Sequence, residues 1–298
     1  MKLELSARHP FSLSAVVKSH GWIRLAPFGQ DEQKRQTGGL TYVDQLNSGR
    51  VVDMDIREAA DGVSVEVGQE LTATEAAEVA EKVRWMLQLD LDLSTFHILA
   101  RKEPKLAHVE ATARGRLLRS PTLFEDTVKT ILTTNTSWAG TIRMVEGFVS
   151  QFGAPLAANP ARRAFPVPEK VAATDEETLR SSVRLGYRAP YVLELARSVA
   201  SGALDLEALK TTDLPTTELR KRFLAIKGVG PYAAANLLML LGRYNFIPVD
   251  SWGIKMVSHE WYGGEPVGAS EVEAAFERWG EWQGLAYWFW DWSYADEG

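Results

Sequence analysis

The chain has 298 residues, of which 45% are hydrophobic and 24% are charged, as is typical of soluble globular proteins. This length predicts about two domains. The absence of cysteine excludes disulfides, thiolate zinc sites and iron–sulfur clusters, and the five histidines lie too far apart to predict a metal site. Charged and polar residues follow Met1, and the longest apolar stretch, residues 233–241, is too short to span a bilayer. We therefore expect a cytoplasmic protein with no membrane partner.

The formal net charge is -6, but the charges are unevenly distributed along the chain. Residues 1–100 and 260–298 are acidic, whereas residues 101–146 hold 8 basic and 5 acidic side chains, and residues 180–230 hold 9 basic and 5 acidic ones. A nucleic-acid-binding face would have to come from these two central stretches. An ordinary solvated surface is the alternative interpretation of such small excesses.

The N-terminal part of the sequence predicts an antiparallel sheet. Short segments with β-branched residues and partial alternation are typical of strands, and Asn47-Ser48-Gly49 and Asp61-Gly62 predict turns between them. The predicted strands are residues 11–17, 41–46, 51–56 and 63–67.

Helical signals dominate the rest of the chain. Apolar residues recur at helical spacing in residues 124–132 and 138–152, and hydroxyl side chains placed before acidic residues or proline predict helix starts. These starts are at Thr72 with Glu75, Ser120 with Pro121, Thr174 with Glu177, and Ser270 with Glu273. The composition changes near residue 105, so we expect an α+β protein with a sheet domain at residues 1–108 and a helical domain at residues 109–298.

The most informative segment is residues 220–257, in which Gly228-Val229-Gly230-Pro231 separates two predicted helices. Two glycines permit a hairpin whose backbone N–H groups stay uncovered. Together with the positive end of the helix that begins at Pro231, these amides form an anion site suited to one phosphate group. A tight helix–helix turn with glycine at the C-cap is the alternative.

This hairpin (LAIKGVGPYAA), the apolar helix after it and the segment PVDSW resemble the helix-hairpin-helix (HhH-GPD) superfamily of base-excision DNA glycosylases. Residues 124–153 and 185–192, and the loop at Phe165-Pro166, resemble the 8-oxoguanine DNA glycosylase branch. The resemblance covers residues 110–260, and the sheet before them is similar in kind to the N-terminal domain of the two-domain branches. It implies that double-stranded DNA with a damaged base is the partner.

In this resemblance Asp250 is the catalytic residue. Cleavage of an N-glycosidic bond builds positive charge on the sugar, so a fixed carboxylate stabilises that state and orients or deprotonates the attacking water. An aspartate after Pro-Val and before a helix is also a common N-cap, and both roles are compatible.

Tyr232 occupies the position at which strand-cutting family members carry a lysine that forms a Schiff base with the sugar. A phenol cannot form an imine, so the resemblance implies a monofunctional glycosylase that leaves an abasic site. Lys227 lies on the other side of the hairpin, where we expect a phosphate contact or a solvated side chain.

Three further residues match DNA-contacting positions of the family. An enzyme that acts on a base in a duplex must extrude it and fill the gap. Asn135 matches the gap-filling asparagine, Tyr187 the aromatic wedge, and Arg188 is placed to hold a phosphate or the orphaned base. A turn asparagine and a core tyrosine are the alternatives for Asn135 and Tyr187.

Aromatic residues predict the base pocket. Ten tryptophans are present, and aromatic faces stack best on electron-poor or cationic bases such as N-alkylated purines. We expect Tyr232, Trp252, Trp138 and Trp288 to line the pocket, although core packing explains most rings of the C-terminal cluster equally well. Alkylated bases are favoured, as in 3-methyladenine DNA glycosylase II. An oxidised-purine glycosylase, with or without lyase activity, and a non-catalytic DNA-binding module stay open.

The resemblance also implies a monovalent cation, Na⁺ or K⁺, held by the backbone carbonyls of Leu224, Ile226 and Val229. No other cofactor is expected. We further expect a monomer, associated with the nucleoid if the protein is bacterial.

Overall fold

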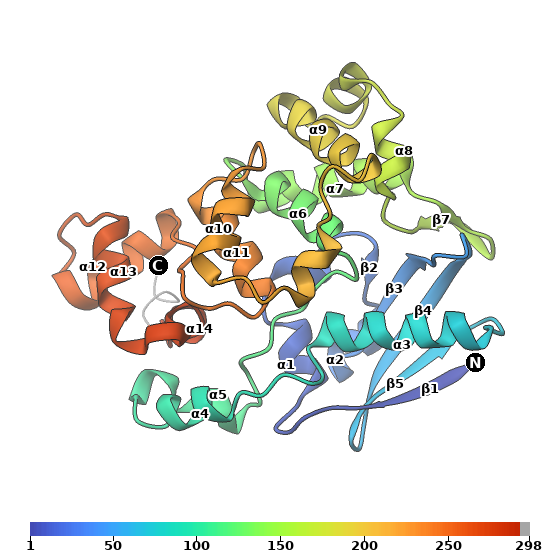
Figure 1. Cartoon of the computed structure of the whole chain (residues 1–298). Helices are drawn as coiled ribbons and strands as arrows, with labels where there is room; N and C mark the ends of the chain where they lie inside the picture. Colours follow the sequence, from blue (N-terminus) through green and yellow to red (C-terminus); the bar gives the residue numbers. More distant parts are fainter. Residues whose placement is uncertain (293–298) are drawn as a thin grey trace. The chain divides into compact units, whose positions relative to one another are not determined.

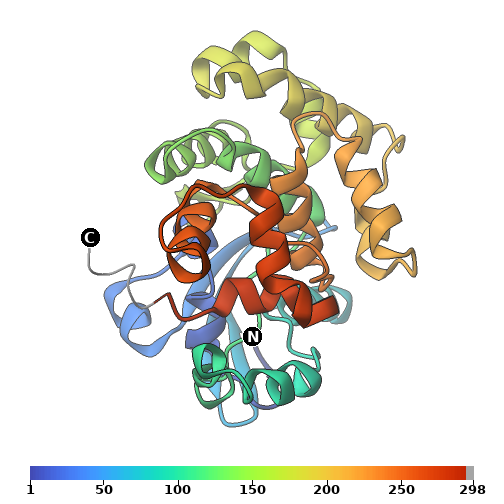
Figure 2. The same ribbon diagram turned by 90° about the vertical axis from the view of Figure 1, so that its left-hand side faces the viewer.

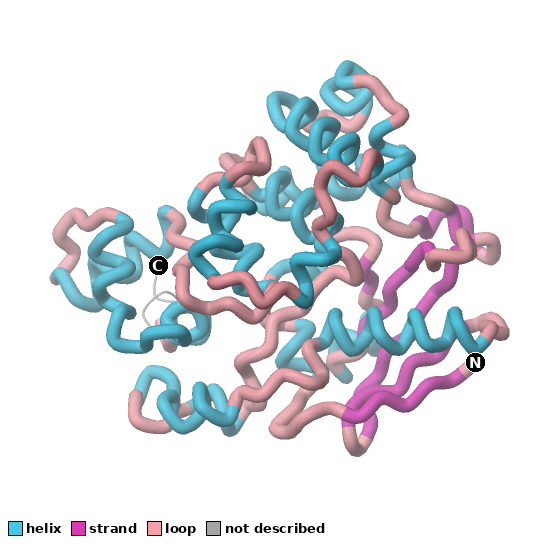
Figure 3. The backbone as a smooth tube through the Cα atoms, viewed as in Figure 1, coloured by secondary structure: helices cyan, strands magenta, loops and turns pink. Residues whose placement is uncertain are grey.

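The computed structural model describes residues 1–292, which form two compact units. Unit 1 comprises Met1–Leu91 and Arg116–Thr212, and unit 2 comprises Asp92–Gly115 and the chain from Asp213 onward. Figure 1 follows the chain through its helices and strands, and Figure 3 separates the two kinds of element by colour. The predicted α+β class is confirmed. The domain boundary at residue 108 stays a prediction.

Unit 1 begins with a five-stranded antiparallel sheet in the order β1-β5-β4-β3-β2. Val52, Met54 and Ile56 of β4 are fully buried while Val51, Asp53 and Asp55 are half-buried, as the two-residue period of a strand requires. The predicted strands at 41–46, 51–56 and 63–67 are confirmed. The strands are β1 (Lys2–Ser6), β2 (Phe28–Gly29), β3 (Leu40–Gln45), β4 (Val51–Ala59) and β5 (Gly62–Val67).

Helix α3 (Ala73–Leu87) runs across this sheet (Figure 1). The predicted capping box is present, because Thr72 Oγ1 accepts the Glu75 N–H and the Glu75 carboxylate accepts the Thr72 N–H. Lys82 then reaches Asp44 of β3 at 2.6 Å. This ion pair ties the helix to the sheet.

The prediction of a strand at residues 11–17 is wrong. Leu13–Val17 form helix α1, whose N-cap Ser12 accepts the Ala15 N–H. A helix of five residues is too short to show a 3.6-residue period, so its apolar residues imitate a strand. The sequence prediction also missed β1. Further short elements of this region are η1 (Gly21–Arg24) and α2 (Glu32–Thr37).

The second part of unit 1 is mainly helical, and two of its predicted helix starts are wrong. Thr122 rather than Ser120 caps α6, because its hydroxyl accepts the Glu125 N–H while the Ser120 N–H donates to Asp126. Asp175 rather than Thr174 accepts the Thr178 N–H. The elements are α6 (Leu123–Thr133), α7 (Trp138–Phe152), β6 (Pro155–Leu156), β7 (Asn159–Arg163), α8 (Pro168–Ala172), η3 (Thr178–Ser182), η4 (Gly186–Arg188), α9 (Ala189–Ala200) and η5 (Glu207–Thr211).

A buried polar cluster fixes α6 to the sheet inside unit 1. Lys129 Nζ lies 2.6 Å from Glu125 Oε1, and the Tyr42 hydroxyl of β3 donates to Glu125 Oε2 at 2.5 Å. Asp126 accepts the indole N–H of Trp22 at 2.7 Å. All of these side chains except Trp22 are at most 1% exposed. Buried polar groups that are hydrogen-bonded specify one arrangement of the helix, which leads directly to Asn135.

Unit 2 joins two segments that are distant in the sequence. Phe96 of α4 stacks on Trp282 with ring centres 5.7 Å apart, and Lys105 donates to the Asp291 carbonyl at 3.0 Å. Figure 2 shows α4 and α5 beside the C-terminal helices. The elements are α4 (Ser94–Ala100), η2 (Pro104–Leu106), α5 (His108–Ala111), α10 (Thr216–Leu224), α11 (Pro231–Leu240), α12 (Ser251–Tyr262), α13 (Ala269–Phe276), η6 (Glu277–Trp282) and α14 (Gln283–Phe289).

The start predicted at Ser270 is also wrong. Helix α13 is capped two residues earlier at Gly268, whose N–H donates to Glu271 at 2.8 Å. The predicted capping box requires a Ser or Thr hydroxyl oxygen at the N-cap, and glycine has no side chain to supply it. Among the helices of residues 1–292, none is both long and apolar enough to cross a membrane.

Candidate functional site

The predicted hairpin lies between α10 and α11 in unit 2. Gly228 has a φ of 86°, a left-handed conformation that favours glycine. The Val229 N–H donates to the Ile226 carbonyl at 3.0 Å, and the Val229 side chain is buried. Gly230 is the N-cap of α11 and Pro231 its first residue, as predicted from the sequence.

The outer face of this hairpin is open. A Cβ built on Gly230 would have no atom within 4 Å, so a ligand can approach the backbone there. Within residues 1–292, the amides of Gly228 and Gly230 donate to no backbone carbonyl. Lys227 is exposed beside them. Open amides at the start of a ten-residue helix have a geometry suited to an anion.

The carbonyls predicted to hold a cation belong to the same turn. The Ile226 carbonyl already accepts the Val229 N–H, but a carbonyl oxygen has a second lone pair. Neutral carbonyl oxygens suit a hard monovalent cation, so the donors of Leu224, Ile226 and Val229 fit the group chemically. The described residues contain no cluster of three His, Cys, Asp or Glu side chains that could hold a metal ion.

Asp250 is the N-cap of α12. Its Oδ1 accepts the Gly253 N–H at 2.8 Å, and its side chain is exposed. The extended backbone of Asp250, with φ -124° and ψ 179°, places the carboxylate at the positive end of the helix. The carboxylate is therefore held by one bond and remains open to a ligand.

Two tyrosines accompany Asp250 within unit 2. Tyr232 is half-buried in the first turn of α11, and Tyr287 of α14 is 4% exposed. Burial raises the pKa of Tyr287 above its usual range, and the charges of Asp250 and Tyr232 raise it further. The charges of Asp250 and Tyr232 thus both act on the Tyr287 hydroxyl.

Asn135, Tyr187 and Arg188 lie together in unit 1. Asn135 has a left-handed φ of 47°, and its Nδ2 donates to the Tyr187 hydroxyl at 3.4 Å. The Arg188 guanidinium donates to the carbonyls of Thr134 and Asn135 and lies 4.4 Å from the centre of the Tyr187 ring. Tyr187 is 45% exposed and Arg188 only 6%. Arg188 therefore supports the loop that presents Asn135 to solvent, and Tyr187 is exposed beside this loop on η4.

The predicted pocket tryptophans are distributed over both units. Trp138, half-buried in unit 1, lies so close to Gly21 that a Cβ there would be 2.2 Å from the indole ring. Trp252, in unit 2, is 45% exposed and its ring centre is 5.7 Å from that of Trp292. Trp288 is half-buried on α14. Trp138 and Trp252 are consequently rings with accessible surface.

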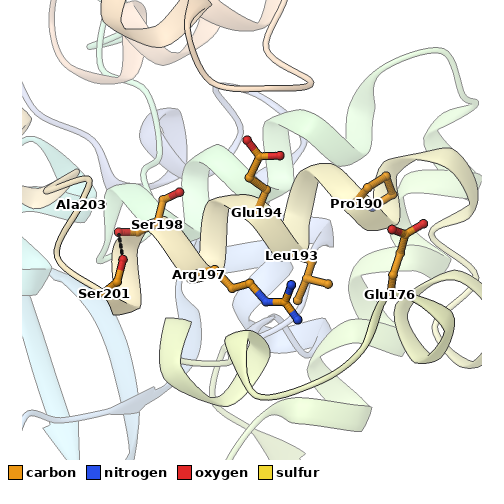
Figure 4. Close-up of a pocket in the computed structure, with 8 residues that line it drawn as sticks. All are labelled: Glu176, Pro190, Leu193, Glu194, Arg197, Ser198, Ser201 and Ala203. Carbon is orange, nitrogen blue, oxygen red and sulfur yellow. Dashed lines mark hydrogen bonds between the residues drawn. The ribbon is translucent and has the colours of Figure 1, made fainter.

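A shallow pocket elsewhere in unit 1 contains none of the predicted residues. It has a volume of about 370 Å³ and is lined by Leu193, Glu194 and Arg197 of α9 and by Glu176 (Figure 4). Figure 4 shows Glu194 and Arg197 pointing to opposite sides of α9. The Arg197 guanidinium donates to the Thr174 carbonyl at 3.3 Å. The predicted chemistry does not depend on this pocket.

Sequence reasoning missed Tyr287 and Gly253 as neighbours of Asp250. Tyr287 falls in an aromatic-rich segment for which core packing was an adequate explanation, and Gly253 is one glycine among 23. Their contact joins α12 to α14 and depends on the tertiary fold. A sequence signal that distinguishes Tyr287 from its neighbours is absent.

Residues 128–281, which are more than half of the chain, match the family described as HhH-GPD superfamily base excision DNA repair protein. The chain belongs to this superfamily. The predicted class, a DNA glycosylase of base excision repair, is thereby confirmed.

Individual relatives agree with this class. Over 183 residues the chain is 28% identical to the DNA-3-methyladenine glycosylase of Bacillus subtilis (strain 168), and the match spans 59% of this chain and 59% of that protein. The 3-methyladenine DNA-glycosylase structure from Archaeoglobus fulgidus has a TM-score of 0.74 and 22% identity, covering 99% of this chain and 98% of the other.

A third relative carries a different activity in its name. It is the Clostridium acetobutylicum 8-oxoguanine glycosylase/lyase, solved with double-stranded DNA containing cytosine opposite 8-oxoG. The TM-score is 0.73 and the identity 19%, with 96% of this chain and 92% of the other covered. The likeness to the two solved structures shows that the fold is shared.

Proposed function

We propose that the protein is a monofunctional DNA glycosylase that hydrolyses the N-glycosidic bond of an alkylated purine and leaves an abasic site. The observation that carries this proposal is the presence of an exposed carboxylate at position 250 and a phenol at position 232. Asp250 caps α12, whereas Tyr232 stands where strand-cutting members of the family have a lysine. A carboxylate supports attack by water, and a phenol cannot replace an amine in Schiff-base formation.

Asp250 supplies the charge that the reaction needs. As the glycosidic bond breaks, positive charge develops on the sugar, and the Asp250 carboxylate, held at one oxygen by the Gly253 amide, stabilises it. The same carboxylate orients or deprotonates the attacking water. Water adds to the sugar carbon, the base leaves with the bonding electrons, and the proton of the water passes to Asp250 or to the departing base.

The remaining residues bind and open the DNA. The amides of Gly228 and Gly230, with the adjacent Lys227, bind one phosphate, and the hairpin carbonyls hold a monovalent cation. Asn135 fills the gap left by the extruded base and Tyr187 wedges beside it, because Asn135 is exposed on the loop that Arg188 supports and Tyr187 is exposed on the adjacent η4. Double-stranded DNA with a damaged base is the proposed partner of one copy of the chain. The proposed location is the cytoplasm, at the nucleoid in a bacterium.

Aromatic rings favour an alkylated base. Cationic N-alkylated purines stack more strongly on aromatic faces than neutral bases do, and Trp138 and Trp252 offer accessible rings. Within unit 2, the proposed pocket residues are Tyr232, Trp252 and Trp288. The 3-methyladenine glycosylase names of two relatives support the same class of substrate.

An oxidised-purine glycosylase is the second candidate. The observations that favour it are the segments around Asn135 and Tyr187, which resemble the 8-oxoguanine branch, and the similarity to an 8-oxoguanine glycosylase/lyase. A lyase would need an amine at the sugar, and Lys227 is the nearest lysine to the hairpin in the sequence.

A panel of duplexes, each with one lesion, tests the proposal. Wild type should release free base from an N-alkylated purine duplex, and the strand should break only after alkali. Asp250→Asn should lower the rate by several orders of magnitude, with lesion-DNA affinity unchanged or improved. Activity of Asp250→Asn within about threefold of wild type would remove Asp250 from catalysis. Binding without base release in every duplex would instead indicate a non-catalytic module.

A further inference from the structure

Gly253 is required by the close approach of a tyrosine. Its N–H holds Asp250 Oδ1, and its backbone is not in the left-handed region that favours glycine. A Cβ at this position would lie 1.9 Å from Tyr287 Oη and 2.9 Å from Tyr287 Cζ. The missing side chain therefore lets the phenol reach the first turn of α12, three residues from Asp250.

The Tyr287 ring is fixed by other aromatic rings. Phe276 of α13 lies 5.6 Å away between ring centres with the planes at 87°, and Trp292 lies 6.1 Å away at 71°. Phenylalanine would fill this space without burying a hydroxyl group, and a buried hydroxyl is costly unless it finds a partner. A buried tyrosine whose oxygen is directed at a catalytic helix therefore indicates a role for the oxygen.

The phenol remains a hydrogen-bond donor under all working conditions. Burial, then Asp250, then Tyr232 raise the pKa of Tyr287 above its usual range, so the proton stays on the oxygen at neutral and mildly alkaline pH. The titratable groups that act on it are Asp250, the N-cap of α12, and Tyr232 of α11, whereas α13 and residue 292 present the rings of Phe276 and Trp292.

We propose that Tyr287 is a positioning residue for base excision, whose hydroxyl donates toward the Asp250 carboxylate oxygen that the Gly253 amide does not hold. One hydrogen bond leaves a carboxylate free to rotate, and a second donor fixes its plane against the sugar. This inference rests on the proposed function of Asp250.

Conservative substitutions test the oxygen alone. Tyr287→Phe keeps the packed ring, and Tyr244→Phe is a matched control, because Tyr244 is 3% exposed, belongs to the same unit and stacks on Trp282. Under single-turnover conditions with saturating enzyme, Tyr287→Phe should release base about 10- to 100-fold more slowly, since hydrogen bonds to charged groups have effects of this size. Lesion-DNA affinity should stay within about threefold, and Tyr244→Phe should match wild type.

A double-variant comparison separates this role from a structural one. Gly253→Ala should slow base release in wild type and have a smaller effect in the Tyr287→Phe background, because its Cβ displaces an oxygen that the second variant lacks.

The outcomes are distinct. Slower release with unchanged lesion-DNA affinity and a reduced effect of Gly253→Ala in the double variant would together support the inference. If wild type excises a base and Asp250→Asn does not, but Tyr287→Phe keeps the wild-type rate, only the role of Tyr287 is overturned. Absence of base release by wild type from every duplex would overturn the proposed function and this inference with it.

Discussion

Removal of the buried amine of Lys129 should destabilise unit 1 strongly. The side chain is fully buried, with Nζ 2.6 Å from Glu125 Oε1 and 4.6 Å from the centre of the Phe28 ring. Lys129→Met keeps an unbranched chain of similar size but removes the positive charge. Glu125 then keeps only the hydrogen bond from the Tyr42 hydroxyl. A buried carboxylate without its counter-charge costs about 3–5 kcal/mol of unfolding free energy.

A second substitution distinguishes charge from packing. Glu125→Gln removes the orphaned charge while its amide oxygen can still accept the Tyr42 hydroxyl. The double variant Lys129→Met/Glu125→Gln should therefore be more stable than Lys129→Met alone by about 2 kcal/mol. If packing around the lysine stem dominates instead, the double variant will be no more stable than the single one.

Urea unfolding monitored by tryptophan fluorescence measures both quantities. Trp22 is a local reporter, because its indole N–H donates to Asp126, the neighbour of Glu125 in α6. The urea concentration at the unfolding midpoint should shift while the dependence of the unfolding free energy on urea concentration stays constant, which indicates a change in stability alone. A loss below about 1 kcal/mol for Lys129→Met would refute the view that this pair is a desolvated, mutually dependent unit.

Three other predictions concern the hairpin, the nucleophile and pH. The Gly230→Leu variant should be as stable as wild type, because open space surrounds the site. Fluorescence anisotropy should show weaker binding to any duplex and a slope of log affinity against log salt concentration that is smaller by about 0.9. Gly228→Leu should weaken binding in the same way and should also unfold more easily, because the positive φ of Gly228 disfavours leucine. If the glycine variants bind duplex DNA as tightly as wild type at all salt concentrations, the hairpin is only a turn. Wild type should form no borohydride-trapped adduct, and Tyr232→Lys should introduce a weak one; a wild-type adduct would indicate another reactive lysine. Burial lowers the pKa of His20 to about 4, so the stability it contributes above pH 6.5, at most about 3 kcal/mol, is lost as the pH falls through 4. Urea unfolding at several pH values should show a weaker dependence of the unfolding free energy on pH for His20→Gln than for wild type. The same pH dependence in both proteins would contradict this cause.

Sequence patterns predicted the elements that depend on residues close together in the chain. The strands at 41–46, 51–56 and 63–67 alternate clearly, and the Thr72 capping box depends on residues only three positions apart. The N-caps at Ser120 and Ser270 were wrong by two residues, because several candidate caps stand side by side there and tertiary contacts choose among them. Ser120 donates its N–H to Asp126 and so cannot be separated from the buried cluster.

In the candidate site, too, the features set by neighbouring residues were predictable and the long-range contacts were not. The start of α11 at Pro231 and the N-cap role of Asp250 follow from neighbouring residues and agree with the structure. The contact between Gly253 and Tyr287 spans two helices, and the support of the Asn135 loop by Arg188 spans more than fifty residues. Contacts of this kind depend on packing, which a residue pattern does not encode locally.

The discontinuous composition of unit 2 has a consequence during protein synthesis. Phe96 is fully buried, in part against Trp282, and these residues are separated by 186 positions in the chain. At about 5–20 residues per second, the ribosome makes the first partner roughly 10–40 s before the second. Throughout this interval the face of Phe96 that packs against Trp282 has no native partner to cover it. The nascent chain is therefore most exposed to aggregation after residues 92–115 have emerged and before the last helices are complete.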